Sequence, residues 1–120
     1  MTDHRLLARR IAVICERSLI NVSTEAAAHN DIAKALAAQG LDVRREVRLS
    51  DRDRIDVMVG GVGVEVKIKG SRRDIYRQLQ RYAASDQVSA LVLATAAAWP
   101  PMPDISGKPF FHASLVKGWL

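Results

Sequence analysis

The sequence predicts an α/β domain, in which helices flank a mixed central β-sheet. Helical and strand patterns follow one another in the order helix, helix, strand, strand, strand, helix, strand, strand. The 120 residues are 48% hydrophobic, which supplies one core and suits a single domain over residues 1–120. The proline-rich segment 96–103 is a loop that is too short to separate two domains.

An extra N-terminal helix is predicted at about residues 4–19, because Leu7, Ile11 and Ile14 recur at helical spacing. Asp3 precedes this helix and is suited to cap it. Arginines cover the other sides, which is typical of an amphipathic helix packed on its own domain. A dimer contact is the alternative use of the same apolar stripe.

The second predicted helix spans about residues 23–39 and stops at Gly40, a residue type that favours the C′ position. Ile32 and Leu36 set its apolar stripe, and Glu25 lies on that same stripe. This acid has two explanations. It interacts favourably with the helix dipole in the first turn, or it belongs to a site beneath the helix. The local pattern leaves both open.

Four further elements are predicted besides the two strands of a hairpin at residues 54–70. Residues 41–49 alternate apolar and charged side chains, which predicts a half-exposed strand. Ser71 is the expected N-cap of a helix that ends near residue 85. The buried stripe of this helix is predicted to be Ile75, Leu79, Tyr82 and Ala83. The apolar run 89–95 predicts a strand covered on both faces, and residues 108–115 predict a last strand.

Residues 54–70, RIDVMVGGVGVEVKIKG, predict a glycine-rich hairpin that carries charges within its apolar runs. Because strand side chains alternate between faces, Ile55, Val57 and Val59 are expected on one face. Asp56 is expected on the opposite face of the same strand. The question is which residues of the returning strand it meets there.

The turn of the hairpin decides this register. A two-residue turn at 60–61 puts Asp56 opposite Glu65, whereas a turn at 61–62 puts it opposite Lys67. Both registers place the three side chains on one face, within roughly 5–8 Å at their Cβ atoms. A three-residue turn would break this parity.

Two carboxylates this close repel each other unless a cation or a proton lies between them. Oxygen ligands favour hard divalent cations, so Mg²⁺ is the predicted cofactor and Mn²⁺ its substitute. A neighbouring lysine can stabilise an attacking hydroxide or the phosphate, and together these groups suit metal-assisted phosphodiester hydrolysis. The alternative is structural, with Asp56 as a strand-edge acid and Glu65 and Lys67 as a solvated pair.

On these residues the chain resembles the PD-(D/E)XK nuclease superfamily, whose core order is helix, three strands, helix, strand. The family's Asp and Glu-x-Lys correspond to Asp56 and Glu65-Val66-Lys67. The resemblance implies a restriction-endonuclease-like core in which Asp56, Glu65 and the main-chain carbonyl of Val66 hold the metal. It also implies that Lys67 assists catalysis. Glu25 matches a helix glutamate that completes the catalytic and metal site in many members.

Gln78 and Tyr82 match the Gln-x-x-x-Tyr helix motif of RecB-like members, and at this spacing they share one helix face. The resemblance implies that they lie beside the site and help to hold DNA. Core packing is the alternative for Tyr82, and a polar helix surface is the alternative for Gln78. The chain departs from the family pattern where Ile55 replaces the proline before the Asp, a position that supplies no ligand.

The segment that follows the hairpin is strongly basic. Its further predicted DNA-binding residues are Lys69, Arg72, Arg73 and Arg77. These side chains are placed to meet phosphates, which supply most nonspecific affinity for nucleic acid. The net charge of +5 permits such a polyanionic partner. A solvated surface is the alternative.

These residues predict a Mg²⁺-dependent DNA nuclease that selects an end, a flap or a junction, in repair, recombination or phage DNA processing. RNA is an alternative substrate. A noncatalytic nucleic-acid-binding module or an accessory subunit is the alternative function. A homodimer is expected, with the first helix, Phe110-Phe111 and residues 115–120 as candidate interfaces. A single cysteine and the lack of a signal peptide or long apolar run predict a cytoplasmic protein away from membranes.

Overall fold

Helices and strands alternate along the chain in the computed structural model, which describes residues 2–115. The elements are α1 (His4–Arg17), α2 (Glu25–Ala38), β1 (Val43–Arg48), β2 (Arg54–Val59), β3 (Val62–Lys67), α3 (Arg72–Ala83), β4 (Ala90–Thr95), β5 (Asp104–Ile105) and β6 (Lys108–Ser114). This order confirms the predicted one, with β5 added. A strand of two residues is too short to show the alternation on which the prediction depends.

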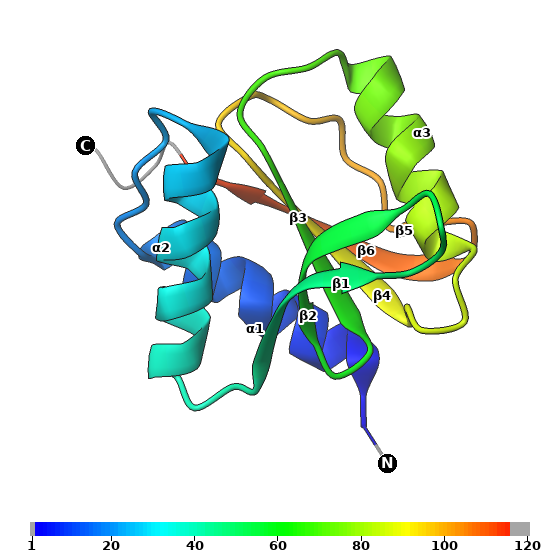
Figure 1. The fold of residues 1–120 in the computed structure, drawn as a ribbon, viewed down its shortest axis with the longest axis horizontal. Helices are drawn as coiled ribbons and strands as arrows, with labels where there is room; N and C mark the ends of the chain where they lie inside the picture. The colour runs from blue at the N-terminus through cyan, green and yellow to red at the C-terminus, as the bar shows by residue number, and fades with distance from the viewer. Residues whose placement is uncertain (1, 116–120) are drawn as a thin grey trace.

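The strands form one mixed sheet in the order β1-β2-β3-β4-β6-β5 (Figure 1). β1, β2 and β3 are antiparallel neighbours, whereas β4 runs parallel to both β3 and β6. The parallel step from β3 to β4 requires a crossover connection, and α3 provides it. The predicted α/β class with a mixed central sheet is therefore confirmed.

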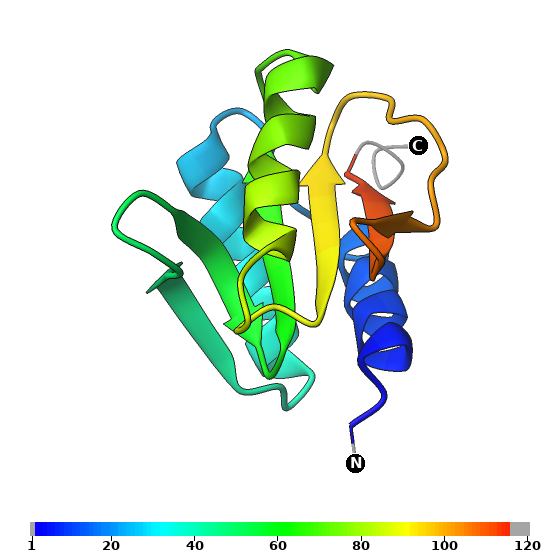
Figure 2. The ribbon, with the colours of Figure 1, turned by 90° about the vertical axis from the view of Figure 1, so that its right-hand side faces the viewer.

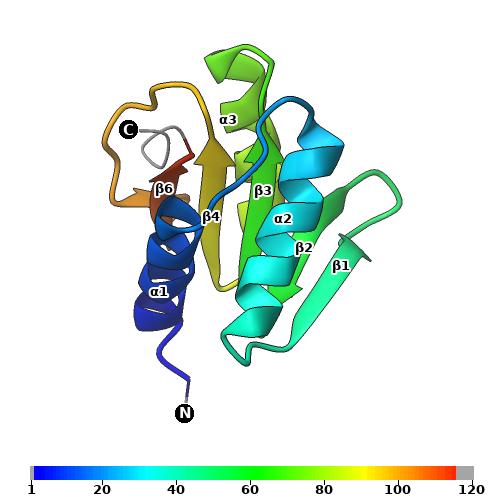
Figure 3. The ribbon, with the colours of Figure 1, turned by 90° about the vertical axis from the view of Figure 1, so that its left-hand side faces the viewer.

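Helices cover both faces of this sheet. Figure 3 shows α1 and α2 side by side on one face, and Figure 2 shows α3 on the other. The α1–α2 side holds a core of Ala, Ile, Leu and Val side chains that includes Ile11, Ile32 and Leu36. The α3 side holds a second core around Leu79 and Tyr82. No helix within residues 2–115 is long and apolar enough to cross a membrane.

Capping residues set the helix limits near the site. Thr24 accepts the N–H of Ala27 at 3.0 Å, so α2 begins at Glu25 rather than at the predicted residue 23. Gly40 follows the end of α2 with a φ of +81°, which confirms the predicted stop. Ser71 accepts the N–H of Asp74 at 3.1 Å and caps α3, and the predicted buried stripe of that helix is confirmed.

The predicted facing of β2 is wrong at Ile55. Alternation places Ile55 with Val57, but Ile55 packs in the α3-side core and Val57 in the α1–α2-side core. The cause lies in β1, where Glu46 adopts a left-handed backbone with a φ of 52°. Glu46 falls opposite Asp56, and neither residue belongs to the paired register of β1 and β2. The side chains therefore change faces at Glu46 in β1 and at Asp56 in β2. Asp56 is a predicted site residue.

The N-terminal helix is part of the domain core. Ile11 of α1 is completely buried against the sheet, and Phe110 of β6 and Leu115 are each 3% exposed. The apolar stripe of α1 and the ring of Phe110 therefore pack within one chain. The homodimer stays a prediction. Residues 116–120, the rest of the predicted interface, lie outside the described residues.

Candidate functional site

The turn of the β2–β3 hairpin has the first of the two predicted registers. Val59 pairs with Val62 and Val57 with Val64, which leaves the first two glycines as the turn. Gly60 has a φ of +56°, a conformation that glycine adopts without strain. In this register Asp56 falls opposite Glu65. The structure therefore brings the two predicted carboxylates together on adjacent strands.

The β2–β3 ladder ends where these carboxylates begin. Beyond the Val57–Val64 pair, the N–H of Val66 donates to Asp56 Oδ2 at 2.8 Å. The N–H of Asp56 donates in turn to Glu65 Oε1 at 3.3 Å. Each carboxylate thus accepts an N–H that a regular ladder would give to a carbonyl. Backbone geometry on both strands therefore holds the two acids in place.

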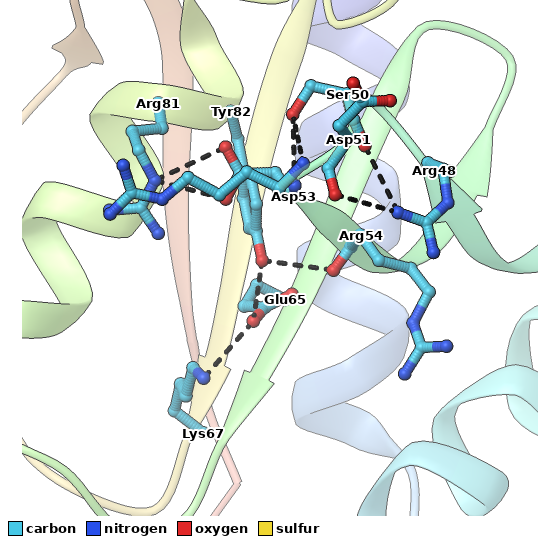
Figure 4. Close-up of polar contacts among 10 residues, drawn as sticks. Arg48, Ser50, Asp51, Asp53, Arg54, Glu65, Lys67, Arg81 and Tyr82 are labelled. Carbon is cyan, nitrogen blue, oxygen red and sulfur yellow. Dashed lines mark hydrogen bonds and ion pairs between the residues drawn. The ribbon is translucent and has the colours of Figure 1, made fainter.

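Glu65 is the most deeply placed charge of the site, with only 2% of its surface exposed. Its Oε2 lies 3.4 Å from Lys67 Nζ and 3.3 Å from the Tyr82 hydroxyl (Figure 4). The same hydroxyl lies 3.2 Å from the carbonyl oxygen of Arg54, to which it can donate. Tyr82 therefore links α3 to both strands of the hairpin.

This environment changes the acid–base behaviour of the site. The pKa of Glu65 is raised from an ordinary 4.5 to about 8, chiefly by burial and then by the neighbouring Asp56 carboxylate. The Lys67 ammonium and the hydrogen bond from the Asp56 N–H act in the opposite direction. Burial also raises the pKa of Tyr82, and the charges of Glu65 and Asp56 act in the same direction. The tyrosine therefore remains a hydroxyl, while Glu65 holds its proton near neutral pH unless a cation compensates its charge.

Tyr82 is completely buried. No part of the ring reaches the surface, so any help that Tyr82 gives in holding DNA would be indirect, through the residues that it contacts. The ring packs in the core, which is the alternative that the sequence offered for Tyr82. The hydroxyl group adds a contact to Glu65. In this structure Tyr82 positions a carboxylate.

Glu25 lies apart from the carboxylate pair. It is the first residue of α2, and its Oε1 accepts the N–H of Ile68 at 3.2 Å, just beyond the end of β3. Within residues 2–115, no group of three or more His, Cys, Asp or Glu side chains lies close enough to hold a metal ion. The structure thus brings Asp56, Glu65 and Lys67 together and leaves Glu25 at the rim.

A polar cleft of about 450 Å³ opens beside Lys67. We call it the basic cleft, and its basic residues are Arg52, Lys67, Lys69, Arg77 and Arg81. Gln78 and Asp74 also line it. Three predicted DNA-binding residues, Lys69, Arg77 and Gln78, therefore surround the site lysine. The cleft meets the carboxylate pair through Lys67, since neither carboxylate lines it. A larger hollow of about 540 Å³ lies at the proline-rich loop, and neither the carboxylates nor Lys67 line it.

The other predicted basic residues have different positions. Arg72 and Arg73 line a separate hollow with Tyr76 and Trp99, not the basic cleft. Glu46 forms a 3.8 Å ion pair with Arg54 at the surface. This exposed pair is solvated and contributes little to stability.

Asp53 contributes to the site without having been predicted. It binds Arg81 of α3, with Arg81 Nε 3.1 Å from Oδ1 and 3.3 Å from Oδ2 (Figure 4). The N–H of Asp53 donates to Ser50 Oγ at 3.0 Å, which orders the β1–β2 turn. The polar turn at residues 50–53 is the only sequence signal of this contact, and it does not identify a partner 28 residues away.

The donor set beside Lys67 is made of hard oxygen atoms. Glu65 lies between the Asp56 carboxylate and the Lys67 ammonium, so two carboxylates share one neighbouring cation whenever Glu65 is ionised. A divalent cation would compensate the charge of Glu65, whose pKa is raised first by burial and then by repulsion from Asp56. The residues therefore fit Mg²⁺ or Mn²⁺, which bind one or two carboxylates and keep water or phosphate as their other ligands.

Comparisons with known proteins identify no family for this arrangement. No protein-family model, no curated protein and no solved structure matches the chain.

Proposed function

We propose that this protein is a metal-dependent nuclease that hydrolyses phosphodiester bonds in nucleic acid, with DNA as the expected substrate. One observation carries the proposal. Asp56 and Glu65 meet at the end of the β2–β3 ladder, with Lys67 3.4 Å from Glu65 and lining the basic cleft. An acid pair that could hold a metal, a lysine and a basic cleft that could receive phosphates are the parts that such hydrolysis requires.

The topology supports the same proposal. α2, the antiparallel strands β1 to β3, the crossover helix α3 and the parallel strand β4 follow the core order of the PD-(D/E)XK resemblance. Asp56 lies on the second of these strands, and Glu65 and Lys67 lie on the third. A restriction-endonuclease-like core is therefore part of the proposal.

A metal ion in this site would be held by Asp56, Glu65 and the Val66 carbonyl, and it would activate water and polarise the phosphate. The protein supplies the rest. Tyr82 and the Asp56 N–H orient the Glu65 carboxylate. Lys67 presents its ammonium to the basic cleft, where it can meet a phosphate. Glu25 stays outside this set, although it remains a predicted site residue.

A cutting assay tests the proposal. Labelled single-stranded, duplex, flap and four-way-junction DNA, and RNA, are incubated with the protein in Mg²⁺, Mn²⁺ or EDTA. We expect metal-dependent cutting that falls by roughly a hundredfold or more in Asp56→Asn, Glu65→Gln and Lys67→Met. Glu46→Gln is the matched control, because Glu46 is an exposed acid on the neighbouring strand that pairs only with Arg54 among the described residues. The substrate that is cut fastest shows whether an end, a flap or a junction is selected.

The noncatalytic alternative also has an observation in its favour. Both carboxylates already accept backbone N–H groups, and Glu65 is almost completely buried, so the pair is satisfied in part without a metal. Binding of nucleic acid without cutting, unchanged in the three variants, would support a binding module instead. A homodimer remains part of the prediction, and a solution mass twice that of the 13.2 kDa chain would support it.

A further inference from the structure

A second hollow lies beside the basic cleft, at the start of α3. It has a volume of about 250 Å³. We call it the aromatic hollow, and its lining residues are Arg72, Arg73, Tyr76, Trp99, Pro100 and Met102. The loop between β4 and β5 supplies Trp99, Pro100 and Met102, and Figure 2 shows this loop arching from the end of β4 down to β5. Segments distant in the sequence thus combine two aromatic rings with two arginines.

The apolar lining of the aromatic hollow suits a flat aromatic group. Tyr76 and Trp99, which line it, are each half-buried. Trp99 is supported from the core by Phe110, with ring centroids 6.4 Å apart. The surface of the hollow is apolar, so Arg72 and Arg73 line it with their aliphatic stems. A volume this small accommodates one ring system, since sites for drug-sized ligands start at roughly 300 Å³.

The aromatic hollow and the basic cleft flank one helix turn of α3. Arg73 and Tyr76 face the aromatic hollow, whereas Asp74 and Arg77 face the basic cleft. An α-helix with its side chains is roughly 10 Å across, and a nucleic-acid strand rises roughly 3.4 Å per nucleotide. About three nucleotides can therefore connect the two sites across the helix.

We propose that the aromatic hollow receives a base of single-stranded nucleic acid whose phosphates lie in the basic cleft. This inference rests on the proposed nuclease function and specifies its substrate class. In a duplex the bases are already stacked and paired, so their faces are not free to meet Tyr76 or Trp99. An unpaired strand offers both a base face and phosphates, and stacking on aromatic rings accepts any base. The two sites together thus select a single-stranded end or flap.

Tryptophan fluorescence tests this contact directly. The chain contains two tryptophans, so Trp119→Phe leaves Trp99 as the reporter. We expect single-stranded DNA to quench this emission. A single strand of the same length made of abasic sites is the matched probe, because it keeps the phosphates and lacks the bases. It should bind more weakly and leave the emission unchanged. Single-stranded RNA in a parallel titration shows which sugar is preferred.

Affinity provides the second measurement. Trp99→Ala and Tyr76→Ala should each weaken binding of the single strand by roughly tenfold or more, whereas Trp99→Phe should retain most of it. Binding of the abasic strand should not change in these variants, which also shows that they are folded. The proposal is overturned if single strands do not quench Trp99 and if both alanine variants bind them normally.

The experiments distinguish a wrong prediction of the base contact from a wrong prediction of nuclease activity. Metal-dependent cutting that is lost in Asp56→Asn, together with duplex as the preferred substrate, would retain the nuclease and reject the aromatic contact. Quenching by single strands without any cutting would retain the contact and reject the nuclease.

Discussion

Glu65 combines burial, a like charge and an opposite charge at one position. Its carboxylate is 2% exposed, and its partners come from three elements: β2, β3 and α3. Such a group is costly in its ionised form, and its raised pKa of about 8 expresses that cost. Perturbed acids of this kind are concentrated at functional sites. Glu65 is therefore the residue whose titration reports most directly on the site.

The pH dependence of stability follows from this raised pKa. Between the ordinary value of 4.5 and about 8, the folded protein holds a proton on Glu65 that the unfolded chain has released. The free energy of unfolding should therefore fall as pH rises through this range, by on the order of a few kcal/mol. Urea denaturation in EDTA from about pH 5 to about pH 9 measures it.

Two controls isolate the contribution of Glu65. Glu65→Gln should remove most of the decline, because the amide does not titrate. Glu46→Gln should keep it, since Glu46 is 59% exposed in its ion pair. Added Mg²⁺ should restore stability near the upper end of the range if the ion binds the pair. A decline of equal size in Glu65→Gln would show that another group causes it.

At the scale of elements, the hairpin β2–β3 carries a tightly packed position as well as the charged site residues. Gly63 of β3 is buried beneath the side chains of the α3-side core. A Cβ atom there would meet Ile55 Cδ1, Leu91 Cδ2 at 3.3 Å and Met58 Sδ at 3.4 Å. Gly63 is thus needed for close packing, and the reversed facing of Ile55 brings the closest of these atoms to it.

Gly63→Ala should therefore lower the free energy of unfolding by about 1–3 kcal/mol, because the added methyl group overpacks the core. Ile55→Val removes the Cδ1 atom that the new Cβ would meet, and by itself it should cost about 1 kcal/mol. We expect the double variant to lose less stability than the sum of the two single losses. Urea denaturation measures all three proteins. Additive losses would mean that Ile55 does not contact position 63.

At the scale of the whole molecule, positive charge alone does not identify a binding face. Exposed arginines of α1, among them Arg9 and Arg10, lie on the sheet face opposite α3. The basic cleft differs because its charges line a hollow together with Lys67, the partner of Glu65. Within that cleft Arg81 is already paired with Asp53, so Lys69 and Arg77 are the expected phosphate contacts.

The salt dependence of binding separates the two faces. Arg77→Ala should reduce the slope of log K against log salt concentration by about 0.7–1, as expected for the loss of one phosphate contact. Arg9→Ala removes the same charge from an exposed position on α1 and should leave the slope unchanged. Anisotropy titrations of one labelled single strand at several salt concentrations give both slopes. Equal effects of the two substitutions would show that binding is diffuse.

Much of this fold follows from local patterns. The apolar run of β4, the N-cap Ser71 and the stop at Gly40 were each predicted from residue types and spacing. Local conformational preferences are strong at such positions, so neighbours along the chain are sufficient to predict them. The facing of Ile55 could not be predicted in this way, because it depends on the left-handed backbone of Glu46 on another strand.

The sequence by itself determined the order of the elements and the presence of Asp56, Glu65 and Lys67 on one hairpin. Only the tertiary structure decided between the two registers of the hairpin. It also placed the buried Tyr82 against Glu65 and divided the predicted basic residues between the basic cleft and the aromatic hollow. The physical reason is that local rules act between neighbours in the chain. Register, burial and partner choice are instead set by packing between residues that are distant in the sequence.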